Sequence, residues 1–205
     1  MTERGGMGKI FMLIGKSASG KDHIYKKLLE DGRLHLKPLT LYTTRPMRAG
    51  EKNGKEYYFS NREQYESLRK AGKIIEERVY PTVHGDWYYF TADDGQIKGN
   101  EDYLTIGTLQ SLIKMKEYFG DGRVKPLYVE SDAYLRLQRS IGRERKQKSP
   151  EYKEVCRRFL ADEEDFSEDK IKSAGIDIRF SNDAELKDCI NELRKYIRKE
   201  TENGG

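Results

Sequence analysis

A glycine-rich loop, set between an apolar run and a helical pattern, constrains this chain more than any other segment. Residues 15–21 read Gly-Lys-Ser-Ala-Ser-Gly-Lys and match the spacing G-x-x-x-x-G-K. The apolar run Ile10–Ile14 before the loop predicts a buried strand, and the spacing of apolar residues over 21–31 predicts a helix after it. Backbone N–H groups in such a loop wrap an anion, and the helix N-terminus adds partial positive charge. The segment therefore predicts a site for nucleotide phosphates, with Lys21 reaching the outer ones.

The residue after the lysine departs from the motif. A serine or threonine hydroxyl is expected there as a Mg²⁺ ligand, but the chain has Asp22. Asp22 could be a first-turn acid that favours the helix dipole, or its carboxylate could hold Mg²⁺. We favour the metal role, because a bare carboxylate would repel a triphosphate. The expected ATP contacts in this segment are Gly15, Lys16, Ser17, Ala18, Ser19, Gly20, Lys21 and Asp22.

Strand and helix patterns alternate along the rest of the chain, which predicts an α/β fold with a mostly parallel sheet flanked by helices. Strands are expected at 74–80, 87–90, 103–106, 126–129 and 176–180. Helices are expected at 62–71, 109–120, 132–141, 151–166 and 186–197. Ser60 and Glu63 are a candidate capping box for the first of these helices.

The segment 43–92 interrupts the alternation, because it is richer in tyrosine, glycine and turn residues. We expect it to form a β-rich insert. The predicted organisation is a single domain over 8–200, with a core of 8–42 and 93–200 and a disordered tail at 201–205.

Composition places the chain among soluble globular proteins. Charged residues make up 36% of the 205, but the net charge is only +4, and 11% of the residues are aromatic. A disordered chain usually combines low hydrophobicity with a large net charge, so this chain can bury a core. No apolar run approaches the roughly 20 residues that span a bilayer, and two cysteines form no disulfide framework. We therefore expect a cytoplasmic protein with no membrane partner, and the mild charge gives no support for nucleic-acid binding.

A second basic motif lies at 43–59 and places Arg45, Arg48, Glu51 and Tyr57 at short intervals. Because the planar arginine fork pairs with phosphate bidentately, two arginines three positions apart suit a second phosphate, carried by the substrate.

This stretch resembles the guanylate kinase signature T-T-R-x-x-R-x-G-E-x-x-G-x-x-Y-x-F, and that family also has a phosphate loop near the start of its chain. The resemblance extends over residues 8–198. It implies a P-loop NTPase-type fold with an NMP-binding insert and a helical lid. It also implies that the protein transfers the γ-phosphoryl group of ATP, with Mg²⁺, to GMP or dGMP. The expected partners are these nucleotides alone, and the expected state is a monomer or a homodimer.

The resemblance assigns roles in the insert by position. Arg45, Arg48 and Tyr57 match residues that hold the GMP phosphate, with Glu51 behind the arginines. Tyr88 matches a second phosphate-contacting tyrosine. Glu76 matches the glutamate that accepts hydrogen bonds from the N1 and N2 edge of guanine. Since Glu77 is adjacent, this assignment could be off by one residue.

The resemblance also places a lid at about 136–150. Arg139 and Arg143 lie within it, and which lid arginine acts stays open. Arg158 matches an arginine that reaches the phosphates of both nucleotides, and Asn182 matches an asparagine near adenine. The predicted catalytic residues are Lys21, Arg45, Arg143 and Arg158.

Three departures from the family pattern indicate a divergent member. Leu41 stands where the family has a serine, and Thr91 is preceded by Tyr89-Phe90, where the family has a glycine directly after its tyrosine. The segment 104–107 reads Leu-Thr-Ile-Gly, where the family has two aspartates. An acid lost there and gained at Asp22 would be a compensating exchange.

Two other functions stay open. A phosphate-loop kinase could act on a different nucleotide or small phosphorylated substrate, because the base pocket is altered. A non-catalytic guanylate kinase-like module that binds phosphopeptides would keep the arginines, but such modules lose the ATP loop, which is intact here.

Overall fold

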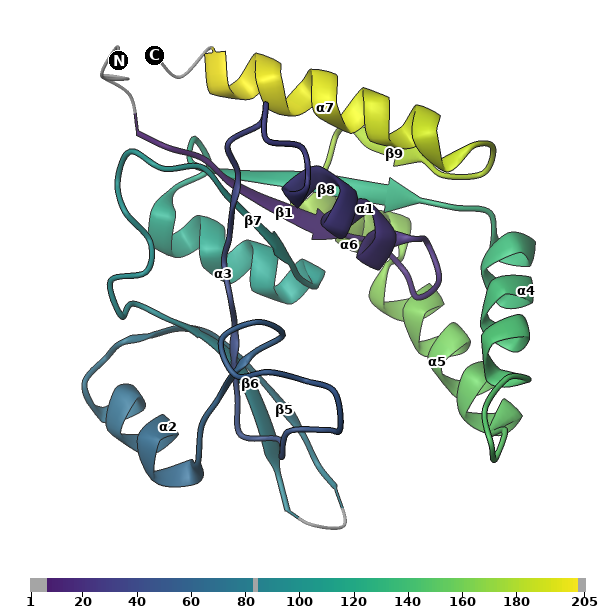
Figure 1. The fold of residues 1–205 in the computed structure, drawn as a ribbon, viewed down its shortest axis with the longest axis horizontal. Coiled ribbons are helices and arrows are strands. Elements are labelled where there is room, and N and C mark those ends of the chain that lie inside the picture. The colour runs from purple at the N-terminus through teal and green to yellow at the C-terminus, as the bar shows by residue number, and fades with distance from the viewer. Residues whose placement is uncertain (1–6, 83–84, 203–205) are drawn as a thin grey trace.

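The computed structural model describes residues 7–82 and 85–202, which form two sheets with helices packed around them (Figure 1). The larger sheet is parallel, with the order β2-β7-β1-β8-β9. This confirms the predicted α/β fold. Its strands are β1 (Ile10–Ile14), β2 (Lys37–Pro38), β7 (Tyr103–Ile106), β8 (Val124–Glu130) and β9 (Arg179–Ser181).

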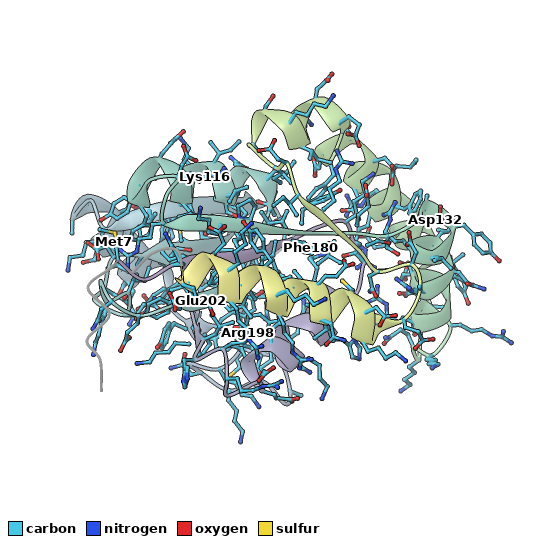
Figure 2. All side chains as sticks on the ribbon, turned by 90° about the horizontal axis from the view of Figure 1, so that it is seen from above. Met7, Lys116, Asp132, Phe180, Arg198 and Glu202 are labelled. Carbon is cyan, nitrogen blue, oxygen red and sulfur yellow. The ribbon has the colours of Figure 1, made fainter. Side chains whose placement is uncertain are left out.

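Helices cover both faces of this sheet, which is why β1 is apolar along its whole length. Phe11 and Leu13 pack into the cluster formed with α1 (Lys21–Leu29) and α7 (Leu186–Glu202). The alternate β1 residues pack into the opposite cluster with α3 (Leu109–Phe119) and α6 (Glu168–Ser173). Figure 2 shows α7 lying across the sheet, next to Phe180 of β9. No helix in the described ranges is long and apolar enough to cross a membrane.

The insert forms the second sheet, with the order β4-β3-β6-β5. Its helix α2 (Arg62–Lys70) covers one face, where Tyr65 packs against Tyr88 and Phe90. The other face is turned toward the core domain (Figure 1). The strands are β3 (Tyr42–Thr43), β4 (Tyr58–Phe59), β5 (Ile74–Tyr80) and β6 (Trp87–Ala92), so this sheet occupies nearly the segment expected for the insert.

Two helices, α4 (Ala133–Glu144) and α5 (Tyr152–Asp165), project together from the core (Figure 1). The segment expected for the lid, about 136–150, comprises most of α4 and the connection to α5. The Asp132 side chain caps α4 by accepting hydrogen bonds from the backbone N–H groups of Tyr134 and Leu135. Asp132 lies at the opposite end of the molecule from Met7 in Figure 2.

Several local expectations were wrong. The capping box of α2 uses Asn61 and Gln64 and not Ser60 and Glu63. The last strand of the core sheet comprises 179–181 and not 176–180, because pairing with β8 begins only at Arg179, while Ile176 packs in the cluster with α6. Helix α7 continues through Glu202, so the first two residues of the expected disordered tail are helical; 203–205 lie outside the described residues. The elements α6, β2, β3 and β4 were not expected and are all short.

Candidate active site

The phosphate loop connects β1 to α1 at the carboxyl end of the sheet, and two of its glycines are required by close backbone packing. Gly15 has φ +152°, and a Cβ there would lie 2.3 Å from the Val129 carbonyl oxygen. Gly20 has φ +97°, and a Cβ there would lie 2.3 Å from Nδ2 of Asn182. Larger residues would therefore distort the loop.

Lys21 folds back over the loop that it terminates. Its Nζ donates hydrogen bonds to the carbonyl oxygens of Gly15, at 2.5 Å, and Lys16, at 2.8 Å. The Asn182 side chain is buried and donates to the Ser19 carbonyl oxygen at 2.8 Å. The contact found for Asn182 is thus with the loop, while its contact with adenine stays a prediction.

Two acidic residues of α5 contact the loop, and the sequence analysis missed both. Asp162 Oδ2 accepts a hydrogen bond from the Ser17 backbone N–H at 2.6 Å. Glu163 pairs with Lys16 at 2.7 Å and also with the buried Arg136. A sequence separation of 147 residues between Lys16 and Glu163 gives no local pattern to detect.

Two adjoining cavities, each of about 1290 Å³, lie between the core and the insert. One is lined by Gly15 and Lys21 from the phosphate loop and by Tyr57 and Tyr89 from the insert. The other lies along β5 and α3 and is lined by Glu76. They share residues of β5 and α5, so together they form one cleft that begins at the phosphate loop.

Arg45 is held rigidly beside this cleft. Its guanidinium pairs bidentately with Glu51, at 2.8 and 3.1 Å, and only 3% of the residue is exposed. The rings of Tyr57 and Phe59 lie 5.7 and 5.5 Å from the guanidinium carbon. Arg48 is exposed, and its backbone N–H donates to Glu51. The two arginines together lower the pKa of the Glu51 carboxyl, chiefly through the Arg45 hydrogen bond.

The structure corrects the predicted second tyrosine. Tyr88 is buried on the α2 face of the insert sheet, with its ring 4.2 Å from Tyr65 and stacked beneath Arg62. Its neighbour Tyr89 points to the opposite face, lines the cleft and lies 5.5 Å from the Tyr57 ring. Successive strand residues point to opposite faces, so an error of one position exchanges the two faces.

The lid arginines differ in how they are held. Arg136 is buried, while Arg139 donates to the carbonyl oxygens of Ala18, at 3.4 Å, and Asn182, at 3.0 Å.

Arg143 is exposed, and its charge acts on Lys21. Arg158 is also exposed and pairs with Glu154 at 3.5 Å; like Arg45 and Arg143 it lines neither cavity, and its role stays a prediction.

Glu76 and Glu77 both line the cleft, but Glu76 is buried at 4% exposure beside Arg78, whereas Glu77 already accepts a hydrogen bond from the Tyr65 hydroxyl of α2. The Glu76 Oε1 atom accepts a hydrogen bond from the Thr91 hydroxyl at 2.8 Å. Burial raises the pKa of the Glu76 carboxyl, and the nearby Arg78 opposes this shift. Of the two adjacent glutamates, Glu76 is therefore the one that could face a base.

Comparisons with known proteins agree with this arrangement. The guanylate kinase family model matches residues 7–91. The guanylate kinase of Porphyromonas gingivalis is 27% identical over 93% of this chain and 97% of its own length. Over most of its length the chain is thus similar to guanylate kinases. The guanylate kinase of Mycoplasma mobile is 37% identical over 53% of this chain and 50% of its own length. The crystal structure of guanylate kinase from Anaplasma phagocytophilum shares the fold, with a TM-score of 0.63 and 22% identity over 96% of this chain and 87% of that one.

Packing explains one departure from the guanylate kinase pattern. A Cβ at Gly107 would lie 2.6 Å from Sδ of Met12 and 2.8 Å from Oγ of Ser111. The aspartate that the family has at this place therefore does not fit here. Thr105, at the place of the other family aspartate, is buried, lines the cleft and has a hydroxyl without a hydrogen-bond partner among the described residues.

Lys21 gives the phosphate-loop site a pH-dependent property. Burial lowers the pKa of its ammonium group to about 8; Asp22 and Asp162 partly oppose the shift. Bound phosphates would raise that pKa again, so we expect nucleotide binding at pH 8–9 to take up a proton and to weaken as pH rises.

Calorimetry of ATP binding in buffers with different ionisation enthalpies measures this uptake. The Lys21→Met variant should lose it, whereas Lys27→Met, at an exposed position paired with Glu30, should keep it. Equal proton uptake in Lys21→Met and the unmodified protein would contradict the assignment.

Proposed function

We propose that the protein transfers the γ-phosphoryl group of ATP to GMP or dGMP and thereby forms ADP and GDP or dGDP. The observation that supports this most directly is the cleft itself. Its one end is the phosphate loop with Lys21, and the facing wall is made by Tyr57 and Tyr89 of the insert. ATP and a nucleoside monophosphate bound there would bring two phosphates together.

Phosphoryl transfer depends mainly on in-line positioning and on neutralising charge. In our proposal Lys21, the loop N–H groups, Arg139 and Arg143 bind the ATP phosphates. Arg45, Arg48, Tyr57 and Tyr89 orient the GMP phosphate oxygen toward the γ-phosphorus. No general base is needed, because the monophosphate is already an anionic nucleophile. Approach of the insert and the lid to the core would exclude water and so limit hydrolysis of ATP.

The function is tested by measuring ADP release with Mg-ATP and a panel of GMP, dGMP, AMP, IMP, CMP and UMP. We expect turnover with GMP and dGMP and little with the others. Turnover that favours another monophosphate would identify a different phosphate-loop kinase. No turnover with any of them, together with tight phosphopeptide binding, would identify a non-catalytic module.

We further infer that Asp22 holds Mg²⁺ at the phosphates. Its exposed carboxylate lines the same cavity as Gly15 and Lys21. No group of three or more His, Cys, Asp or Glu side chains in the described part of the chain could hold a metal. Mg²⁺ suits such a site, because it binds through one or two carboxylates, the substrate phosphates and several waters. The bound ion would neutralise charge on the phosphates.

Asp22→Ala should raise the Mg²⁺ concentration needed for half-maximal ATP binding and turnover by about tenfold. The matched control is Asp188→Ala, in the first turn of α7 and remote from the loop. An unchanged Mg²⁺ dependence and rate in Asp22→Ala would instead leave Asp22 as a first-turn helix acid.

We also expect the correction of the second tyrosine to be visible in kinetics. Tyr89→Phe should raise the KM for GMP by roughly tenfold, the effect of losing one hydrogen bond to a charged group. Tyr88→Phe, one residue away on the opposite face, should stay within about twofold of the original KM. The opposite order of effects would restore the assignment to Tyr88.

A further inference from the structure

Beside Glu76, the same face of β5 carries an arginine for which the family resemblance supplies no role. Arg78 Nε lies 3.4 Å from Oε2 of Glu76, and the two side chains are 15% and 2% exposed. The two atoms form an ion pair, but neither makes a hydrogen bond to the residues that the structure describes, although both are buried. Buried polar atoms are normally hydrogen-bonded, so this ion pair leaves a donor and an acceptor for which a ligand would supply hydrogen bonds.

The position of Arg78 identifies which part of a nucleotide it would meet. Arg78 lines both cavities and so lies where they join, whereas Glu76 lines only the cavity along β5 and α3. The charge of Arg78 also acts on Tyr57, which lines the cavity that contains the phosphate loop. Arg78 therefore lies between the residue proposed to read the base and a residue proposed to hold the phosphate.

The chemistry of guanine matches this pair of side chains. Guanine presents N1–H and N2–H donors on one edge and the acceptors O6 and N7 beside them, and an arginine fork pairs bidentately with O6 and N7. A carboxylate is the complementary acceptor for N1–H and N2–H. Adenine would place its N6 amino donor against the arginine and its unprotonated N1 against the carboxylate, so both contacts would become repulsive.

Two departures from the family pattern explain why an additional donor would be needed here. Leu41 and Gly107 carry no polar side-chain group, and Gly107 has no room for one. The pocket thus lacks polar groups that the family pattern would provide, whereas Arg78 adds a guanidinium to it.

We propose that Arg78 is a specificity-determining residue that donates hydrogen bonds to O6 and N7 of guanine while Glu76 accepts from N1–H and N2–H. This inference rests on the proposed GMP kinase activity and deepens it. Since Arg78 does not contact the transferring phosphoryl group in this arrangement, it should act on KM and base choice and barely on kcat.

The test combines variants of Arg78 with a substrate that lacks one acceptor. Binding without ATP and full kinetics are measured with GMP, with 7-deaza-GMP, which has a C–H in place of N7, and with AMP. The variant is Arg78→Met. The control is Arg62→Met, which removes an arginine stacked on the opposite face of the same sheet. Thermal melting establishes that each variant is folded.

For Arg78→Met we expect the Kd and KM for GMP to rise roughly 10- to 100-fold. The preference of the unmodified protein for GMP over 7-deaza-GMP should disappear in this variant, and discrimination against AMP should weaken. Arg62→Met should keep both preferences. An undiminished preference for GMP over 7-deaza-GMP in Arg78→Met would overturn the proposal.

A second variant keeps the test decisive if Arg78→Met does not fold. Arg78→Lys retains the positive charge beside Glu76 but loses the planar fork, so it should discriminate less than the unmodified protein between GMP and 7-deaza-GMP. Full discrimination by Arg78→Lys would contradict bidentate recognition. Failure of the unmodified protein to phosphorylate GMP would instead refute the proposed function, and the two failures are thereby distinguished.

Discussion

Replacing Lys21 with methionine should lower kcat by about 10³-fold, the upper range for removing one preorganised donor to developing charge. Lys21 lines the cleft and terminates the phosphate loop, and its ammonium group already lies at the centre of the loop, bonded to the carbonyl oxygens of Gly15 and Lys16. Methionine has a similar length and no charge, so the change removes the donor with little change in volume. Single-turnover kinetics with GMP would measure the chemical step directly.

The control for this variant is Lys27→Met on the same helix, which should stay within about twofold of the original kcat. Thermal melting separates a folding defect from a catalytic one. A Lys21→Met protein that is folded and keeps more than a tenth of the original kcat would refute the assigned role.

Replacing Arg45 with alanine should lower kcat/KM for GMP by about 10²- to 10³-fold while the Kd for ATP changes little. The physical reason is that Arg45 belongs to the insert, where Glu51 and the flanking aromatic rings fix its guanidinium, whereas the phosphate loop lies across the cleft. The comparison needs GMP kinetics and direct ATP binding on the same preparation.

The same substitution should lower the free energy of unfolding by about 1.5–3 kcal/mol, because it removes charged hydrogen bonds from a buried group. Kinetics must therefore be measured well below the melting temperature. Arg33→Ala removes an exposed arginine remote from the cleft. It should leave both kcat/KM for GMP and the free energy of unfolding nearly unchanged. Equal losses of GMP turnover and ATP affinity in Arg45→Ala would contradict its assignment to the GMP side.

Much of the fold followed from local patterns. A fully apolar β1, the glycine spacing of the loop and the helical spacing after it were sufficient to predict the strand, the loop and α1. The shift of the α2 cap from Ser60 to Asn61 shows the limit of such patterns, since both residues can cap a helix and only the backbone geometry selects one.

The residues of the site also divide into those that local spacing predicted and those that only packing placed. Arg45, Glu51 and Tyr57 lie in a motif of fixed spacing and meet in space as that motif predicted. For β6 the sequence offers no distinction between the two faces, because the run 87–90 is aromatic throughout. Packing of Tyr88 against α2 is what turns Tyr89 toward the cleft.

By itself, the sequence determined the phosphate loop, the α/β alternation, the insert and its phosphate-binding motif, because each depends on residues close together in the chain. Only the tertiary structure decided that Asp162 and Glu163 contact the loop, that Tyr65 engages Glu77, and that Arg78 lies beside Glu76. The physical reason is that these contacts depend on how helices and sheets pack, and packing joins residues that no local spacing relates.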